Sequence, residues 1–167
     1  MTRPFWADAV AVICEGLRQD LIERGEHTLN YADPSIDADR YLQQAVALRP
    51  DNAKAQGLLA YTLALGDKGS GEASGAGGTI ETAQRAARHA LRLDSAEPHA
   101  RLALIVLQRP LLDLATSEEK LREILATAPD NVMVMRHLWG LLQSAGRSRD
   151  ALAFIERALA VEPMAAG

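Results

Sequence analysis

Four similar segments recur along the chain, and their spacing constrains the fold more than any other feature. Each is rich in alanine and leucine and ends in a turn residue; the segments are Ala45–Pro50, Ala90–Ser95, Ile124–Pro129 and Ala158–Pro163. Their last residues are separated by 45, 34 and 34 residues, which indicates a 34-residue period with one insertion of 11. A repeat of this length is a supersecondary unit that cannot bury its apolar face alone, so we expect successive units to stack.

The composition indicates that each unit is built from helices. Hydrophobic residues make up 48% of the 167 residues and are mostly alanine and leucine, whereas aromatic residues make up only 4%. Alanine and leucine favour helices, and the few β-branched residues leave little material for strands. We therefore expect an all-α fold in which Ser35, Thr79, Ser117 and Ser148 cap helix starts. The expected helices cover about 5–24, 36–48, 53–65, 80–93, 97–108, 117–127, 131–145 and 148–161.

The residues at fixed places in the period resemble the tetratricopeptide repeat (TPR), a helix–turn–helix unit. The resemblance extends over about residues 36–163 and is carried by leucines, small residues and turn residues. In the last unit these are Leu138, Leu142, Gly146, Ala151, Ile155, Ala158 and Pro163; earlier ones are Leu59, Ala60, Leu63, Ala83, Ala87 and Ala90. The resemblance implies an α-α superhelix, a TPR solenoid of about four helix pairs. The chain is also similar to the C-terminal TPR regions of bacterial winged-helix regulators and nucleotide cyclases, although it carries no DNA-binding or cyclase motif.

The repeat register predicts a single TPR-like domain over residues 1–167. An atypical N-terminal helix pair covers 5–50, and a TPR unit with a Gly/Ser-rich insertion at about 67–78 covers 51–95. A degenerate unit follows over 96–129, where Ile105 and Ile124 stand in place of small residues. A regular unit covers 130–163. In that last unit, Met135 and Trp139 stand at packing positions, so we expect both in the core.

Several function classes are disfavoured by what the sequence lacks. A net charge of −4 without a basic block argues against direct nucleic-acid binding, and no apolar run approaches the roughly 20 residues of a membrane span. The histidines lack metal-ligand spacing, and Cys14 has no second cysteine for a disulfide or a thiolate zinc site. In the glycine-rich insertion Lys68 precedes the glycines, which is the wrong order for a phosphate-binding loop. We therefore expect no cofactor, no metal and no catalytic residue, and a cytoplasmic location.

The resemblance implies that the first helices of the units line a concave groove that binds a partner. Basic, aromatic and amide groups in such a groove suit an extended peptide, whose carboxylates and backbone need donors. The sequence therefore predicts a non-catalytic module that binds a peptide or helical segment of a partner protein, as the regulatory region of a bacterial signalling or transcription protein does. The predicted partner-binding residues are Lys54, Tyr61, His99, Arg109, Met133, Arg136, His137 and Gln143.

The sequence also permits other interpretations of the function. A small TPR protein also suits a secretion or assembly chaperone that holds an unfolded client, and the apolar ends of a short solenoid allow a homo-oligomer. An enzyme is the least supported class, because no nucleophile–base pair is visible. Arg85, Arg88, His89 and Arg92 share one helix face that could attract an acidic partner; we favour a solvated outer face, partly neutralised by Glu81.

Overall fold

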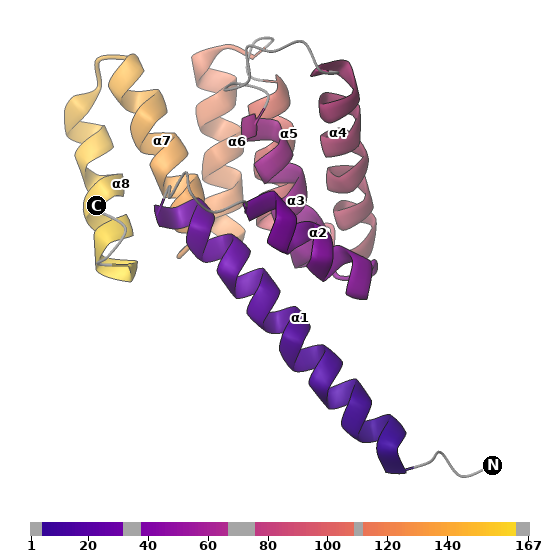
Figure 1. Ribbon diagram of the computed structural model, residues 1–167. Coiled ribbons are helices and arrows are strands. Elements are labelled where there is room, and N and C mark those ends of the chain that lie inside the picture. Colours follow the sequence, from indigo (N-terminus) through magenta and orange to yellow (C-terminus); the bar gives the residue numbers. More distant parts are fainter. Residues whose placement is uncertain (1–4, 32–37, 67–75, 109–111, 163–167) are drawn as a thin grey trace.

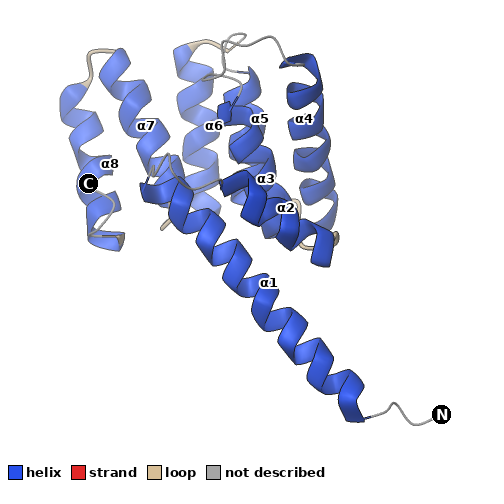
Figure 2. Ribbon diagram, in the orientation of Figure 1, coloured by secondary structure: helices blue, strands red, loops and turns tan. Residues whose placement is uncertain are grey.

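The chain folds into eight α-helices, as the computed structural model in Figure 1 shows. The structure describes residues 5–31, 38–66, 76–108 and 112–162. Within these ranges there is no strand (Figure 2), which confirms the all-α prediction. The helices are α1 (Phe5–Tyr31), α2 (Ala38–Leu48), α3 (Ala53–Gly66), α4 (Ala76–Leu93), α5 (Pro98–Gln108), α6 (Leu114–Thr127), α7 (Val132–Ser144) and α8 (Ser148–Val161).

Consecutive helices pack in pairs, and the pairs stack into the predicted superhelix. α3 packs against α4 and α7 against α8, while α3 also packs against α5, the first helix of the next pair. α5 and α6 form the least extensively packed of the four pairs. They belong to the unit in which Ile105 and Ile124 replace small residues, and larger side chains hold helix axes further apart.

Small side chains allow the paired helices to approach closely. The alanines that carry the repeat are almost completely buried: Ala45, Ala60, Ala83, Ala90, Ala151 and Ala158. Leu138 and Leu142 fill the space between neighbouring helices and are also fully buried. The repeat pattern therefore identified the core contacts of these units correctly.

The turn between α7 and α8 follows the prediction for Gly146. This glycine has a φ of +73°, the left-handed conformation that glycine adopts most easily. The following amide, Arg147 N–H, donates to the Leu142 carbonyl at 2.9 Å, which closes the end of α7 in a typical C-terminal capping arrangement. Ser148 is the first residue of α8 and donates to Gln143 Oε1 at 2.9 Å, so it does not cap α8 as predicted.

Two other predicted helix starts are wrong. α6 begins at Leu114 because Asp113 caps it: an Asp113 carboxylate oxygen accepts from Thr116 N–H at 2.7 Å. Hydrogen bonds from Thr116 lower the pKa of the Asp113 carboxyl. Ser117 therefore lies inside the helix, where it is buried, and Thr79 lies inside α4, which begins at Ala76. Ser35 lies outside the described residues.

α1 is longer than predicted and leaves the stack. Its 27 residues span about 40 Å, whereas the 11 residues of α2 span only about 16 Å. Figure 1 shows its N-terminal part running away from the other helices and its C-terminal part reaching them. The helix continues through Gly25, where a Cβ would lie 2.7 Å from Leu42 Cγ, because α1 and α2 meet closely there.

The last unit contains one wrong core prediction. Met135 is fully buried as expected, but the Trp139 residue is 39% exposed to solvent. The indole therefore lies at the surface of α7 and not in the core.

Candidate functional site

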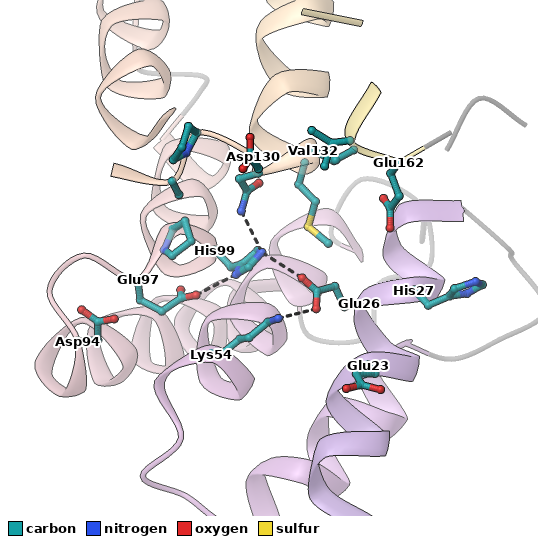
Figure 3. A pocket seen from close by; sticks show the side chains of 16 residues that line it. Glu23, Glu26, His27, Lys54, Asp94, Glu97, His99, Asp130, Val132 and Glu162 are labelled. Atoms are coloured by element: carbon teal, nitrogen blue, oxygen red, sulfur yellow. Dashed lines mark hydrogen bonds and ion pairs between the residues drawn. The ribbon is translucent and has the colours of Figure 1, made fainter. Parts of the chain in front are cut away.

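A cleft of about 810 Å³ opens where the C-terminal part of α1 meets the ends of the stacked helices (Figure 3). Its walls come from α1, the start of α3, the α4–α5 turn with the start of α5, the α6–α7 turn with the start of α7, and the end of α8. Side chains from five parts of the chain therefore converge on one space. The lining residues are Glu23, Glu26, His27, Lys54, Asp94, Glu97, Pro98, His99, Ala128, Pro129, Asp130, Asn131, Val132, Met133, Val161 and Glu162.

Glu97 and His99 form a buried pair at the start of α5. Proline at the first helical position, Pro98, needs no amide partner, and Glu97 precedes it as the capping residue. One Glu97 oxygen accepts from Ala100 N–H at 2.5 Å, and the other accepts from His99 Nδ1–H at 2.8 Å. Glu97 is only 3% exposed and His99 only 5%. The hydrogen bonds to Ala100 and His99 therefore replace those that the Glu97 carboxylate would make with water.

Asn131 connects this pair to α7. Its Oδ1 caps α7 by accepting from Val134 N–H at 3.0 Å, and its Nδ2 donates to His99 Nε2 at 3.2 Å. The imidazole of His99 is thus held between Glu97 on its Nδ1 side and Asn131 on its Nε2 side. The Nε2 contact with Asn131 joins α5 to α7, whereas the Nδ1 contact with Glu97 lies within the start of α5.

Glu26 brings α1 to the same place. Its carboxylate lies 2.6 Å from Lys54 Nζ and 3.9 Å from His99 Nε2, as the dashed lines in Figure 3 show. Lys54 remains about half exposed, so this ion pair contributes little stability. Its effect is local, because it holds the Lys54 ammonium against α1.

Negative charge dominates the cleft. Lys54 is its only lysine or arginine among the described residues, and the two histidines are His27 and His99. Six carboxylates line it: Glu23, Glu26, Asp94, Glu97, Asp130 and Glu162. The sequence led us to expect donors for a partner's carboxylates, whereas the charge balance of the cleft complements a cationic partner.

Two further predicted residues form a separate contact outside the cleft lining. Tyr61 on α3 and His137 on α7 are joined by a 2.9 Å hydrogen bond between Oη and Nε2, and their rings meet edge to face. This bond connects residues 76 positions apart, across two non-consecutive pairs of the stack. Burial raises the pKa of the Tyr61 phenol to about 12, and the positive charge of Arg136 opposes this rise.

The raised pKa predicts a loss of stability in alkali. The folded state keeps the Tyr61 proton at pH values where the unfolded chain, with an ordinary tyrosine pKa near 10, releases it. The free energy of unfolding should therefore fall as pH rises, by about 1 kcal/mol between pH 9 and 11, and by roughly 2–3 kcal/mol once pH exceeds 12.

Urea unfolding of the wild type and of Tyr61→Phe between pH 9 and 11 measures this contribution. The phenylalanine variant should be about 1 kcal/mol less stable at pH 9, because it loses the bond to His137. Its stability should then decline less with pH, so that the difference closes. Parallel pH profiles for the two proteins would contradict the assignment to Tyr61.

The structure brings together only some of the predicted binding residues. Lys54, His99 and Met133 line the cleft; His99 and Met133 do so as buried side chains. Tyr61 and His137 contact one another, with Arg136 close enough to influence Tyr61. Gln143 is exposed at the α7–α8 turn and accepts from Ser148. Arg109 lies outside the described residues.

The predicted binding residues do not include eight polar residues of the cleft: Glu23, Glu26, His27, Asp94, Glu97, Asp130, Asn131 and Glu162. Glu26 follows the predicted end of the first helix, so it was assigned to no element. Asn131 stands just before a helix start, where a capping preference was the available signal, whereas Glu97 caps α5 without being a preferred capping residue. That signal identifies caps but does not tell which caps face a cleft.

Two further properties of the described chain bear on function. The described residues contain no group of three or more histidine, cysteine or acidic side chains arranged to hold a metal ion. Among the helices of the described ranges, none combines the length and apolar character needed to cross a bilayer.

Comparison with known proteins finds similarity at the level of structure. No protein-family model and no curated protein matches the sequence. A thermophilic TPR protein of Thermus thermophilus is 21% identical over 87% of this chain and 74% of its own, with a TM-score of 0.59. PilF of Pseudomonas aeruginosa is 17% identical over 90% of this chain, with a TM-score of 0.50; the match covers 63% of that protein.

Proposed function

Because the chain has the tetratricopeptide-repeat fold, we propose that it is a non-catalytic protein-interaction domain that binds a peptide or helical segment of a partner. The observation that carries this proposal is the cleft, since side chains from five parts of the chain converge on one open space. A surface assembled from several units suits an extended segment better than a small substrate.

The cleft favours a segment that carries lysine or arginine. Glu23 and Asp130 lie at the cleft, and the Asp130 side chain retains 76% of its exposure, so both are accessible to a partner. Met133 and Val132 add apolar surface beside the carboxylates. A lysine or arginine stem can pack on such apolar surface while its charged head meets the carboxylates.

The predicted binding residues have different places in this proposal. Lys54, His99 and Met133 belong to the cleft itself, where Lys54 also holds Glu26. Arg136 and His137 extend the contact surface along α7.

The hydrogen bonds of His99 support a non-catalytic role. An imidazole that acts as a general base needs a free ring nitrogen within reach of a substrate proton. In this structure Nδ1 donates to Glu97 and Nε2 accepts from Asn131, and the ring is buried. The pair thus serves the packing of α5 against α7.

Peptide selection tests the proposal. Ten-residue peptides selected by display against the full chain should be enriched in lysine and arginine. Binding of labelled selected peptides, measured by fluorescence anisotropy, should weaken at least tenfold in the double variant Glu23→Lys/Asp130→Lys, because two carboxylates become cations. Raising the salt concentration should also weaken binding.

A matched control separates the cleft from general charge effects. Glu119→Lys/Glu156→Lys makes the same charge change at exposed residues of α6 and α8 outside the cleft, and should bind within twofold of the wild type. Circular dichroism and urea midpoints should be unchanged in both variants. Equal binding by the wild type and the cleft variant would exclude the cleft, and selection of apolar peptides regardless of charge would favour a chaperone for unfolded clients.

A further inference from the structure

The outward face of α4 carries an arrangement that the cleft does not use. Arg85, Arg88 and Arg92 are spaced three and four residues apart, so they lie on one side of the helix over about 10 Å. All three lie on the solvent side of the helix. The opposite side of α4 is formed by buried alanines that pack into the core: Ala83, Ala86, Ala87 and Ala90.

These three arginines, which we call the arginine stripe, differ from most other arginines of the described chain. Seven arginines elsewhere lie within 4 Å of a carboxylate: Arg18, Arg24, Arg49, Arg101, Arg122, Arg147 and Arg157. Within the described ranges, no arginine of the stripe has such a partner. Glu81, one turn before Arg85, does not lie within 4 Å of these guanidinium groups either.

The stripe therefore combines like charges without compensation. Cations three and four residues apart on a helix repel one another, which slightly destabilises the helix. One of the three is also held in place: Arg92 Nη2 donates to His89 Nδ1 at 3.0 Å, and His89 Nε2–H donates to the Pro50 carbonyl at 3.2 Å. A guanidinium fixed before binding loses less entropy when a partner arrives.

We propose that the arginine stripe is a second docking surface and that it binds an acidic helical segment of a partner protein. Carboxylates at positions i, i+3 and i+7 of a helix have the same 10 Å rise as the stripe, and arginine pairs with carboxylates in bidentate geometry. This surface lies on α4, outside the set of residues that line the cleft, so it can be tested independently of the proposed function.

Two other classes of partner fit the stripe less well. Nucleic acid is bound through many phosphate contacts, whereas the stripe offers three cations on a chain with a net charge of −4. A membrane-surface helix inserts large apolar residues beside its basic ones. Glu81 and Thr82 adjoin Arg85 on the outward side of α4, and among the described residues of this helix only one large apolar residue, Leu93 beside Arg92, is more than a third exposed.

Two labelled helical peptides of identical composition provide the test. Both are 18 residues of alanine and glutamine with three glutamates, which share one face at i, i+3 and i+7 in the first peptide and point to three different sides in the second. By fluorescence anisotropy at 50 mM salt, the full chain should bind the first peptide at least fivefold more tightly. The variant Arg85→Gln/Arg88→Gln/Arg92→Gln should bind it at least tenfold more weakly than the wild type.

The matched control removes the same charge from paired arginines. Arg101→Gln/Arg122→Gln/Arg157→Gln should bind the first peptide within twofold of the wild type, and both variants should keep the wild-type circular dichroism spectrum. Equal binding of the two peptides, or unchanged binding by the stripe variant, would overturn the proposal. Tighter binding of a 15-nucleotide single-stranded DNA or of phosphatidylserine vesicles, abolished in the stripe variant, would overturn the assignment to a protein partner. The variant Glu23→Lys/Asp130→Lys keeps all three arginines of the stripe, so it should bind the first helical peptide like the wild type whether or not it still binds peptides in the cleft.

Discussion

Replacing Glu97 by alanine should lower the free energy of unfolding by about 3 kcal/mol, because a buried carboxylate with two donors is lost. The variant leaves His99 Nδ1 and Ala100 N–H without the carboxylate that they contact, at residues that are almost completely buried. It also removes the cap of α5 and the volume that the side chain fills beside α3. Urea unfolding followed by circular dichroism measures the loss.

Three further variants show whether the carboxylate acts through His99. Glu97→Gln keeps an acceptor and should cost about 1–2 kcal/mol, less than alanine. In a double-mutant cycle, Glu97→Ala and His99→Ala should be coupled by at least about 1 kcal/mol, since they share one hydrogen bond. Glu123→Ala, an exposed carboxylate near Arg101, should change stability by less than about 0.5 kcal/mol. A Glu97→Ala protein as stable as the Glu123→Ala protein would refute the buried network.

Gly57→Ala should destabilise the protein by about 2–3 kcal/mol, although alanine is the better helix former. A Cβ at position 57 would overlap the Glu97 carboxylate and lie 3.1 Å from Ala100 N. The Glu97 side chain cannot move away cheaply, because both oxygens are engaged and the residue is buried. The steric conflict therefore outweighs the gain of about 1 kcal/mol in helix propensity. Urea unfolding of the variant beside the wild type measures the difference.

Gly140→Ala is the matched control for this prediction. Gly140 lies inside α7, and a Cβ there meets nothing within 4 Å, so the same substitution should stabilise the protein by about 0.5–1 kcal/mol. In the Glu97→Ala background, the cost of Gly57→Ala should fall below about 1 kcal/mol, since the nearest atoms are gone. An undiminished cost in that background would show that Gly57 is required for another reason.

Substitutions at Gly57 and Glu97 test the stability of the protein around the cleft, whereas substitutions at Glu23 and Asp130 test the proposed binding of a partner. Glu97 lines the cleft as a buried side chain and packs against Gly57, whereas Glu23 and Asp130 are exposed. Substitutions at Gly57 and Glu97 should change unfolding free energies, and charge reversals at Glu23 and Asp130 should change peptide affinity. A partner that binds elsewhere would be insensitive to the second set.

The arrangement of the repeat units was predictable because it depends on residues close in sequence. Ala83, Ala87 and Ala90 lie on one face at helical spacing, and such a face allows a neighbouring backbone to approach whatever the rest of the fold is. The same register placed Lys54, His99 and Met133 near the concave side, and the structure brings these three to one cleft.

The helix starts show where local signals are ambiguous. Asp113 and Ser117 are both good capping residues four positions apart, and nothing between them prevents a helix. The structure uses Asp113, so that the first turn of α6 forms earlier and the Ser117 side chain is buried. Burial against other helices, which no local rule contains, decides between two caps of similar quality.

By itself, the amino-acid sequence determined the helical repeat and the close contacts inside it, because both follow from side-chain size and spacing within about 34 residues. Only the tertiary structure decided how α1 leaves the stack, how Glu26 meets Lys54 and His99, and that, within the described chain, no arginine of the stripe lies within 4 Å of a carboxylate. Those features depend on distances between residues far apart in the chain. Such distances are set by the packing of Gly25 on Leu42 and by the stacking of whole helices, not by any period in the sequence.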